Sequence, residues 1–86
     1  MLRLVTEGIY KKKSVVFNHI FSFPIEKGTK VNFLWDTELK CPTITLESSP
    51  YVFRRLNGKW YITAFGQTLP IHFPNGGVPY PFSYYK

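Results

Sequence analysis

The side chains that could serve as catalytic bases or nucleophiles are few and widely spaced in this chain. His19 and His72 are its two histidines, and Cys41 is its single cysteine. A cysteine nucleophile needs a base beside it, and the neighbours of Cys41 in the sequence supply none. The carboxylates fall mostly in or beside expected turns, where solvent surrounds them: Glu7, Glu26, Asp36, Glu38 and Glu47. We therefore expect a protein that is not an enzyme.

The spacing of these residues predicts no metal or cofactor site. No pair of Cys or His stands at metal-ligand spacing, and no glycine-rich phosphate loop precedes a helical segment. A short chain with one cysteine cannot form an internal disulfide, which is typical of a reducing compartment. The first residues lack the apolar run of a signal peptide or of a membrane span. We expect no cofactor, no metal, no membrane contact and a cytoplasmic location.

The charge balance favours an acidic macromolecular partner. Lys and Arg number 11 against 5 Asp and Glu, and the net charge is +6. A summed positive field raises the rate of encounter with negative surfaces. The same charge also keeps an aromatic-rich small domain in solution, so composition alone leaves both roles open. Lys11, Lys12 and Lys13 form the densest basic cluster, in an expected turn.

Aromatic residues supply most of the material for a core. The 86 residues include eight Phe, six Tyr and two Trp, and each large ring buries roughly 150–250 Å². A chain of this length forms one domain. We expect a small β domain over residues 1–73, and a tail rich in Pro, Gly and Tyr over residues 74–86. The tail is expected to fold back, because a small sheet gains from having an open edge covered.

Short runs of β-branched and aromatic residues between turn formers predict an all-β fold with little or no helix. Strands are expected at 2–10, 14–23, 30–37, 41–47, in two hairpin arms within 51–64, and at 69–73. Pro24 should end the second run, because proline has no amide hydrogen to donate. The result is a single antiparallel meander of about six strands, either an open sheet or a partly closed barrel. Its expected core consists of Phe17, Phe21, Phe23, Val31, Phe33, Trp35, Ile44, Leu46, Phe53, Trp60 and Ile62.

The dipeptide Asn57-Gly58 fixes the register of one hairpin, because both central positions of a type I′ turn need a positive φ. Pairing outward from the turn sets Leu56 opposite Lys59, Arg55 opposite Trp60, Arg54 opposite Tyr61 and Phe53 opposite Ile62. The expected dry face carries Tyr51, Phe53, Trp60, Ile62 and Ala64, with Arg55 lying across the indole. The expected wet face carries Val52, Arg54, Leu56, Lys59, Tyr61 and Thr63.

The segment NGKWY at 57–61 is similar to the aromatic hairpin of choline-binding and glucan-binding cell-wall repeats. The similarity covers five residues, and the regular recurrence of that family is missing from this chain. Hairpin chemistry alone explains the match, so no ligand site is carried over to this sequence.

Recognition of a protein partner is the function that these patterns favour, because protein interfaces are enriched in Tyr, Trp and Arg. The expected function is non-catalytic binding of an acidic surface, as by a virus- or mobile-element-encoded modulator or inhibitor of a host protein. The alternative is a small β-barrel that binds single-stranded nucleic acid in a basic groove with stacking rings. Copies could also associate through their sheet edges. The expected contact residues are Arg54, Lys59 and Tyr61, then Lys11, Lys12 and Lys13, then Tyr80, Phe82, Tyr84 and Tyr85.

Overall fold

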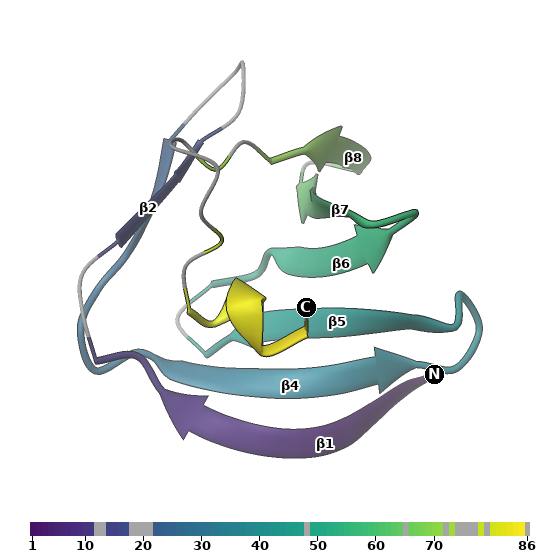
Figure 1. Cartoon of the computed structure of the whole chain (residues 1–86), viewed down its shortest axis with the longest axis horizontal. Coiled ribbons are helices and arrows are strands. Elements are labelled where there is room, and N and C mark those ends of the chain that lie inside the picture. Colours follow the sequence, from purple (N-terminus) through teal and green to yellow (C-terminus); the bar gives the residue numbers. More distant parts are fainter. Residues whose placement is uncertain are drawn as a thin grey trace.

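The computed structural model describes residues 1–11, 14–17, 22–47, 49–64, 66–71, 73, 78 and 80–85, with only the backbone described at 14–17, 22 and 23. Two antiparallel sheets are present in this part of the chain, one of six strands and one of two (Figure 1). The strands are β1 Leu2–Ile9, β2 Ser14–Phe17, β3 Ser22–Ile25, β4 Lys30–Asp36, β5 Cys41–Leu46, β6 Val52–Leu56, β7 Lys59–Ala64 and β8 Gln67–Pro70.

The larger sheet has the order β1-β4-β5-β6-β7-β8, and every neighbouring pair in it is antiparallel. It is therefore a meander into which the β2–β3 hairpin is inserted between β1 and β4. Among the described strands, β1 and β8 are the two edges and do not pair with each other, so the sheet is open and not a closed barrel. The prediction of an all-β, antiparallel fold is confirmed.

Two predicted strand boundaries are wrong. The run expected as one strand at 14–23 contains two paired strands, β2 and β3, and Pro24 lies inside β3 opposite Val15. Proline is tolerated there because both strands of a two-stranded sheet are edges. The last strand begins at Gln67, two residues before the expected start, because Gly66 with a φ of 73° lets the chain reverse soon after β7. The side chains of Phe17, Phe21 and Phe23 lie outside the described part.

The Asn57-Gly58 hairpin has the predicted register. Phe53 pairs with Ile62, and the pairs then continue in order to Leu56 with Lys59 at the turn. The φ angles of Asn57 and Gly58 are 54° and 78°, as a type I′ turn requires. Local turn chemistry therefore determines which side chains of β6 and β7 share a face.

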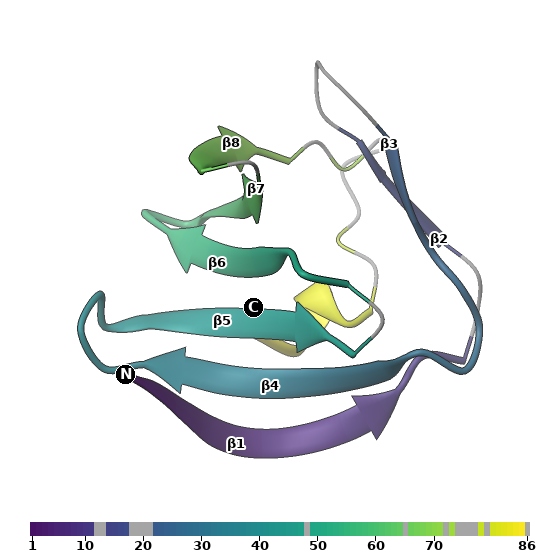
Figure 2. The same cartoon turned by 180° about the vertical axis from the view of Figure 1, so that it is seen from behind.

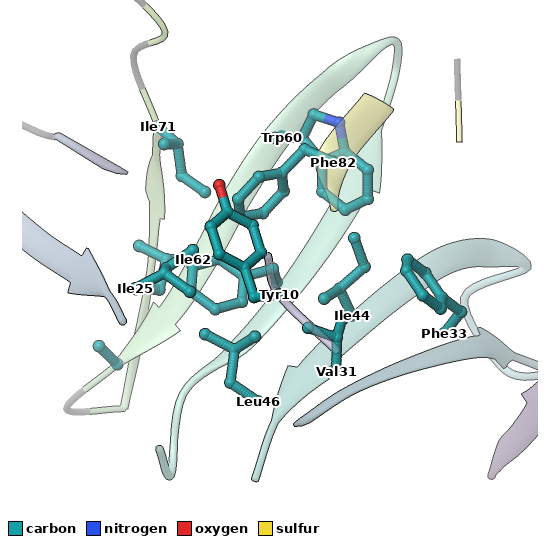
Figure 3. Close-up of a cluster of buried hydrophobic side chains, with 12 residues drawn as sticks. Tyr10, Ile25, Val31, Phe33, Ile44, Leu46, Trp60, Ile62, Ile71 and Phe82 are labelled. Carbon is teal, nitrogen blue, oxygen red and sulfur yellow. The ribbon is translucent and has the colours of Figure 1, made fainter. Parts of the chain in front are cut away.

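The core lies on one face of the sheet, which we call the inner face, and it contains most of the predicted residues (Figure 3). Val31, Phe33, Ile44, Leu46, Phe53, Trp60 and Ile62 are buried as expected. Further buried members are Tyr10, Ile25, Ala64, Ile71 and Phe82. Trp35 was expected in the core and is instead 39% exposed.

The end of the chain covers part of the inner face. The short 3-10 helix η2, Phe82–Tyr85, lies against the sheet in both views (Figures 1 and 2). Phe82 has no exposed surface, and its ring centroid is 5.2 Å from those of Phe53, Trp60 and Phe73. The expected domain boundary after residue 73 adjoins residues outside the described part and stays a prediction.

Trp35 is exposed because η2 does not extend over it. The ring of Phe33, two residues earlier on β4, contacts the rings of Tyr80, Tyr84 and Tyr85. Within the described residues Trp35 has no such ring contact. The alternation along β4 correctly gives the face on which Trp35 lies, but that face is covered only as far as Phe33.

The burial of Phe82 gives a first prediction. Phe82→Ala should lower the free energy of unfolding by about 3–5 kcal/mol, the usual range for removing a buried phenylalanine ring. Tyr84→Ala removes a neighbouring ring that is 48% exposed, and should cost clearly less. Urea denaturation followed by circular dichroism measures both values. Equal losses for the two variants would show that η2 does not dock as described.

Candidate partner-binding surface

Arg54, the first of the expected contact residues, is engaged within the protein. Its Nε donates to Asp36 Oδ2 at 3.4 Å, and its Nη1 donates to Thr63 Oγ1 at 2.9 Å. It lies opposite Thr43, whose side chain has no exposed surface. Arg54 therefore joins three strands across the outer face, opposite the core, and is not a free cation for a partner.

Asp36 is the anion that holds Arg54 in place. Its Oδ1 accepts hydrogen bonds from the backbone amides of Leu39 at 3.0 Å and Glu38 at 2.9 Å. The Leu39 amide has the largest effect, and together with the Glu38 amide and Arg54 it holds the pKa of this carboxyl below its usual 3.8, against the burial that raises it. Asp36 thus stays ionised and neutralises Arg54.

Lys59 and Tyr61, the other expected residues of the outer face, remain accessible to different degrees. Lys59 is exposed at the hairpin turn, whereas Tyr61 is half-buried and directly opposite Arg54. The three residues do share one face, as predicted. Because Arg54 is neutralised, the expected cationic patch is reduced to Lys59 beside a half-buried tyrosine.

The remaining expected contacts divide into accessible and covered residues. Lys11 is exposed, and Lys12 and Lys13 lie outside the described part. Tyr80 and Tyr84 are 41% and 48% exposed. Phe82 is a core residue, which corrects its assignment as a contact residue, because the rings of the sheet enclose it.

Tyr85 is also committed to the fold. Its phenol donates to the backbone carbonyl of Leu34 at 3.1 Å, while its own carbonyl accepts a hydrogen bond from Arg55 Nη1. Burial, with a smaller contribution from Tyr84, raises the pKa of Tyr85 to about 12. Tyr85 thus fixes the end of η2 to β4 and β6, and its side chain remains only partly exposed.

A row of side chains crosses the inner face at the end of the sheet where the chain begins. The sequence did not indicate this row. Arg3 lies opposite Trp35, and Trp35 lies opposite Pro42. Pro42 and Arg55 line one groove together. We call Arg3, Trp35, Pro42 and Arg55 the inner row. Only the pairing of β1 with β4, which are far apart in sequence, brings Arg3 beside Trp35.

Two shallow grooves border the inner row. One has a volume of about 420 Å³ and is lined by Arg3, Leu4, Val5 and Trp35. The other has a volume of about 280 Å³ and is lined by Pro42, Arg55, Gly58 and Tyr85. Each groove places a guanidinium group beside an aromatic ring, so each can accept an apolar side chain that is flanked by a carboxylate.

The same end of the sheet carries an excess of free positive charge. Lys40 ends the turn between β4 and β5, Lys59 follows the hairpin turn, and both are exposed. The β4–β5 turn lies at the end of the sheet where the chain begins (Figure 1). The two carboxylates of the β4–β5 region are neutralised, Asp36 by Arg54 and Glu38 by the terminal amine at 3.3 Å. In contrast, Arg3, Lys40 and Lys59 make no ion pair with any described carboxylate.

The groups that could perform covalent chemistry are not assembled in the described part of the chain. Cys41 is 3% exposed, and burial raises the pKa of its thiol, so the thiol stays protonated and shielded. His19 and His72 lie outside this part. No group of three His, Cys, Asp or Glu side chains that could hold a metal ion is found among the described residues.

Comparisons with known proteins give no further guide. No protein family, curated protein or solved structure matches this chain. Nor do the described residues include a helix of the length and apolar character needed to cross a membrane. The inner row, with the free cations near it, is therefore the candidate binding surface on geometric grounds.

Asp36 gives a prediction for the pH dependence of stability. Because its folded pKa is lowered, its contribution is present above the unfolded pKa of 3.8 and is lost as pH falls through the folded value. Asp36→Asn should be less stable than the native protein at neutral pH, and should lose less stability on acidification below about pH 5. Urea midpoints at several pH values test this.

Glu47→Gln is the matched control, because it removes an exposed carboxylate without a described side-chain partner. It should retain the native loss of stability in acid. If Asp36→Asn and Glu47→Gln had the same pH profile, the Asp36–Arg54 contact would not stabilise the fold in the way described.

Proposed function

We propose that this protein is a non-catalytic binding protein that recognises an acidic surface on another protein. The observation that carries the proposal is the exposed Trp35 ring beside Arg3, at an end of the sheet where nearby carboxylates are neutralised. Trp and Arg are the side chains most often responsible for binding energy at protein interfaces. We propose that the inner row contacts the partner directly.

Trp35 supports this role through its packing. It is a large ring that the fold leaves 39% exposed, so a partner can still remove much apolar surface from water. The neighbouring strands hold it between Arg3 and Pro42, and the ring is therefore positioned before binding. Positioning in the free protein lowers the entropic cost of binding.

The free cations support an acidic partner. Arg3, Lys40 and Lys59 together attract negative charge to the end of the sheet that carries the inner row. Such charges act mainly on the rate of association, and salt screens them. Arg55 can also contribute, because a guanidinium group has five N–H donors and one described hydrogen bond engages a single nitrogen.

Single-stranded nucleic acid remains the alternative partner, because a base could stack on Trp35 beside Arg3. Proteins that bind single strands usually offer several rings in succession, whereas the inner row contains one aromatic residue. We therefore favour a protein partner. A virus- or mobile-element-encoded modulator of a host protein, acting in the cytoplasm, is consistent with the small size and the single free thiol.

The proposal predicts that binding requires Trp35. A pull-down that uses the native protein as bait, in a lysate of the cells that produce it, should capture one acidic protein, which mass spectrometry identifies. Calorimetry with that purified protein should show affinity at least about thirtyfold weaker for Trp35→Ala, the loss of roughly 2 kcal/mol expected at a hot spot. Leu39→Ala, which alters a 54% exposed apolar residue in the β4–β5 turn, should bind normally.

Two outcomes would contradict the proposal. Binding that is unaffected by Trp35→Ala and by Arg3→Glu would exclude the inner row as the contact surface. Capture of nucleic acid in a Trp35-dependent manner, with affinity for a mixed-sequence single strand that falls steeply with salt, would instead support the alternative.

A further inference from the structure

Strand β1 forms an unusually open sheet edge. It has eight residues and pairs on one side with β4, and no described strand pairs with its other side. Leu2, Leu4, Val5 and Ile9 are 40%, 53%, 53% and 61% exposed. Natural edge strands are protected from pairing with other chains by Lys or other charged residues, by Pro, by β-bulges or by being very short. Strand β1 contains neither Lys nor Pro and is not short, although it has two charged residues, Arg3 and Glu7, and a bulge at Val5 that any added strand must accommodate.

The opposite edge of the same sheet is protected. Strand β8 has four residues, it begins with the polar residues Gln67 and Thr68, and Pro70 ends it. Because proline cannot donate a backbone hydrogen bond, it prevents regular extension of the sheet. One edge of this sheet is therefore closed to further strands and the other is open.

A β-bulge in β1 determines which side chains an added strand would meet. Leu4 pairs with Leu34 and Thr6 pairs with Phe33, so Val5 is an extra residue. The alternation of faces therefore changes phase at Val5. Arg3 lies on the inner face with Thr6 and Gly8, whereas the outer face carries Leu2, Leu4, Glu7 and Ile9.

We propose that two copies of this protein form a two-fold dimer in which their β1 strands pair antiparallel. Opposed residues in such a pair must lie on the same face. Because of the bulge, this condition holds when Leu2 lies opposite Ile9 of the second copy. The same register sets Arg3 opposite Gly8 and Leu4 opposite Glu7, and it brings the bulges of the two strands together at Val5 and Thr6, where the ladder is interrupted.

This register matches the side chains of the two copies. On the outer face, Leu2 and Leu4 of one strand adjoin Ile9 of the other, and apolar area leaves the solvent at both ends of the pair. Glu7 already forms an ion pair with Lys30 at 3.4 Å, so the added strand would not leave the Glu7 carboxylate without a compensating charge. On the inner face, Gly8 has no side chain, and the Tyr80 hydroxyl fills the place that a Cβ would take, so Arg3 of one copy would lie beside the Tyr80 phenol of the other. The dimer would leave Trp35, Pro42 and Arg55 of both inner rows uncovered, and it extends the proposed function without depending on it.

Charge favours the antiparallel pair over a parallel one. Parallel pairing in register would place identical charges in neighbouring strands about 4.8 Å apart. In the antiparallel pair the two Arg3 positions are five residues apart, roughly 17 Å at about 3.3 Å per residue, which exceeds the screening length of about 8 Å. Once both β1 edges are paired, the remaining edges of the described six-stranded sheets are the protected β8 edges, so these sheets extend no further than a dimer.

Analytical ultracentrifugation and light scattering of the full chain test the association. The native protein should have twice the 10.1 kDa monomer mass. Leu4→Lys should raise the dimer dissociation constant at least about tenfold, because it places a lysine on the open edge. Leu39→Lys makes the same change at an equally exposed leucine in the β4–β5 turn, and should remain dimeric.

Cysteine cross-linking tests the register. The double variant Leu2→Cys/Ile9→Cys should form a covalent dimer on mild oxidation or with a short bis-maleimide. Neither single variant should do so, because identical positions would be seven residues apart, roughly 23 Å. Cys41 is buried and does not interfere.

Three results would overturn the dimer. They are a monomeric mass at every concentration up to about 1 mM, a dimer that Leu4→Lys leaves unchanged, and a dimer that the double cysteine variant fails to link. Circular dichroism of each variant verifies folding, which surface substitutions at exposed positions should leave intact. Leu4 also lines the groove beside Trp35, whereas Leu2 and Ile9 do not, so the mass of the native protein and the cross-linking result test the dimer independently of whether Trp35 binds a partner.

Discussion

The contact on which the rest of this structure depends is the insertion of Phe82 into the inner face of the sheet. A single open sheet buries its apolar face only if a second layer covers it. In the described part of this chain, the rings of the C-terminal segment provide that cover, and Phe82 packs against Phe53 and Trp60 at ring-centroid distances of 5.2 Å. Arg55 and the Tyr85 phenol then hold the segment in place. The positions of the core and of the exposed inner row both follow from the area that this segment covers.

Because the C-terminal segment covers only part of the inner face, that face has a buried part and a solvent-exposed part. Up to Phe33 the inner face is closed by tyrosine rings, and one pleat further Trp35 is open to solvent. The outer face needs no second layer because its polar side chains bond to one another, as in the Asp36–Arg54 ion pair and the Asn32–Thr45 hydrogen bond at 3.2 Å. Arg54, which the sequence suggests as a free cation, is consequently paired within the fold. Trp35, which is expected in the core, is instead the exposed aromatic ring of the inner row.

The sequence predicts those parts of the structure that local chemistry decides, and it does not predict those that depend on contacts between distant segments. Turn chemistry at Asn57-Gly58 was enough to predict the register of that hairpin and four of its pairs, from Leu56 with Lys59 to Phe53 with Ile62. Alternation gives the face of a strand residue, but it does not reveal what covers that face, and this explains the error at Trp35. Phe82 was expected among the contact residues because the sequence does not show where the tail packs. Likewise, the ion pair between Arg54 and Asp36 spans 18 residues and depends on strand order. The inner row could not be found from sequence, because it requires the pairing of β1 with β4 across the inserted hairpin.

The bulge at Val5 allows one strand to serve both proposed surfaces. With uninterrupted alternation from Thr6, Leu2 and Leu4 would lie on the inner face, and Arg3 would lie on the outer face with Glu7. The extra residue reverses the first half of β1, so that Arg3 stands beside Trp35 while Leu2 and Leu4 join Ile9 on the outer face. A partner bound on the inner face would therefore use mainly Arg3 of β1, whereas a second copy paired along the edge would use mainly Leu2, Leu4 and Ile9, with Leu4 and Val5 also lining the groove beside Trp35. Two copies joined in this way would present two inner rows on the same face, and linked sites bind a partner with repeated acidic surfaces more strongly than either site alone.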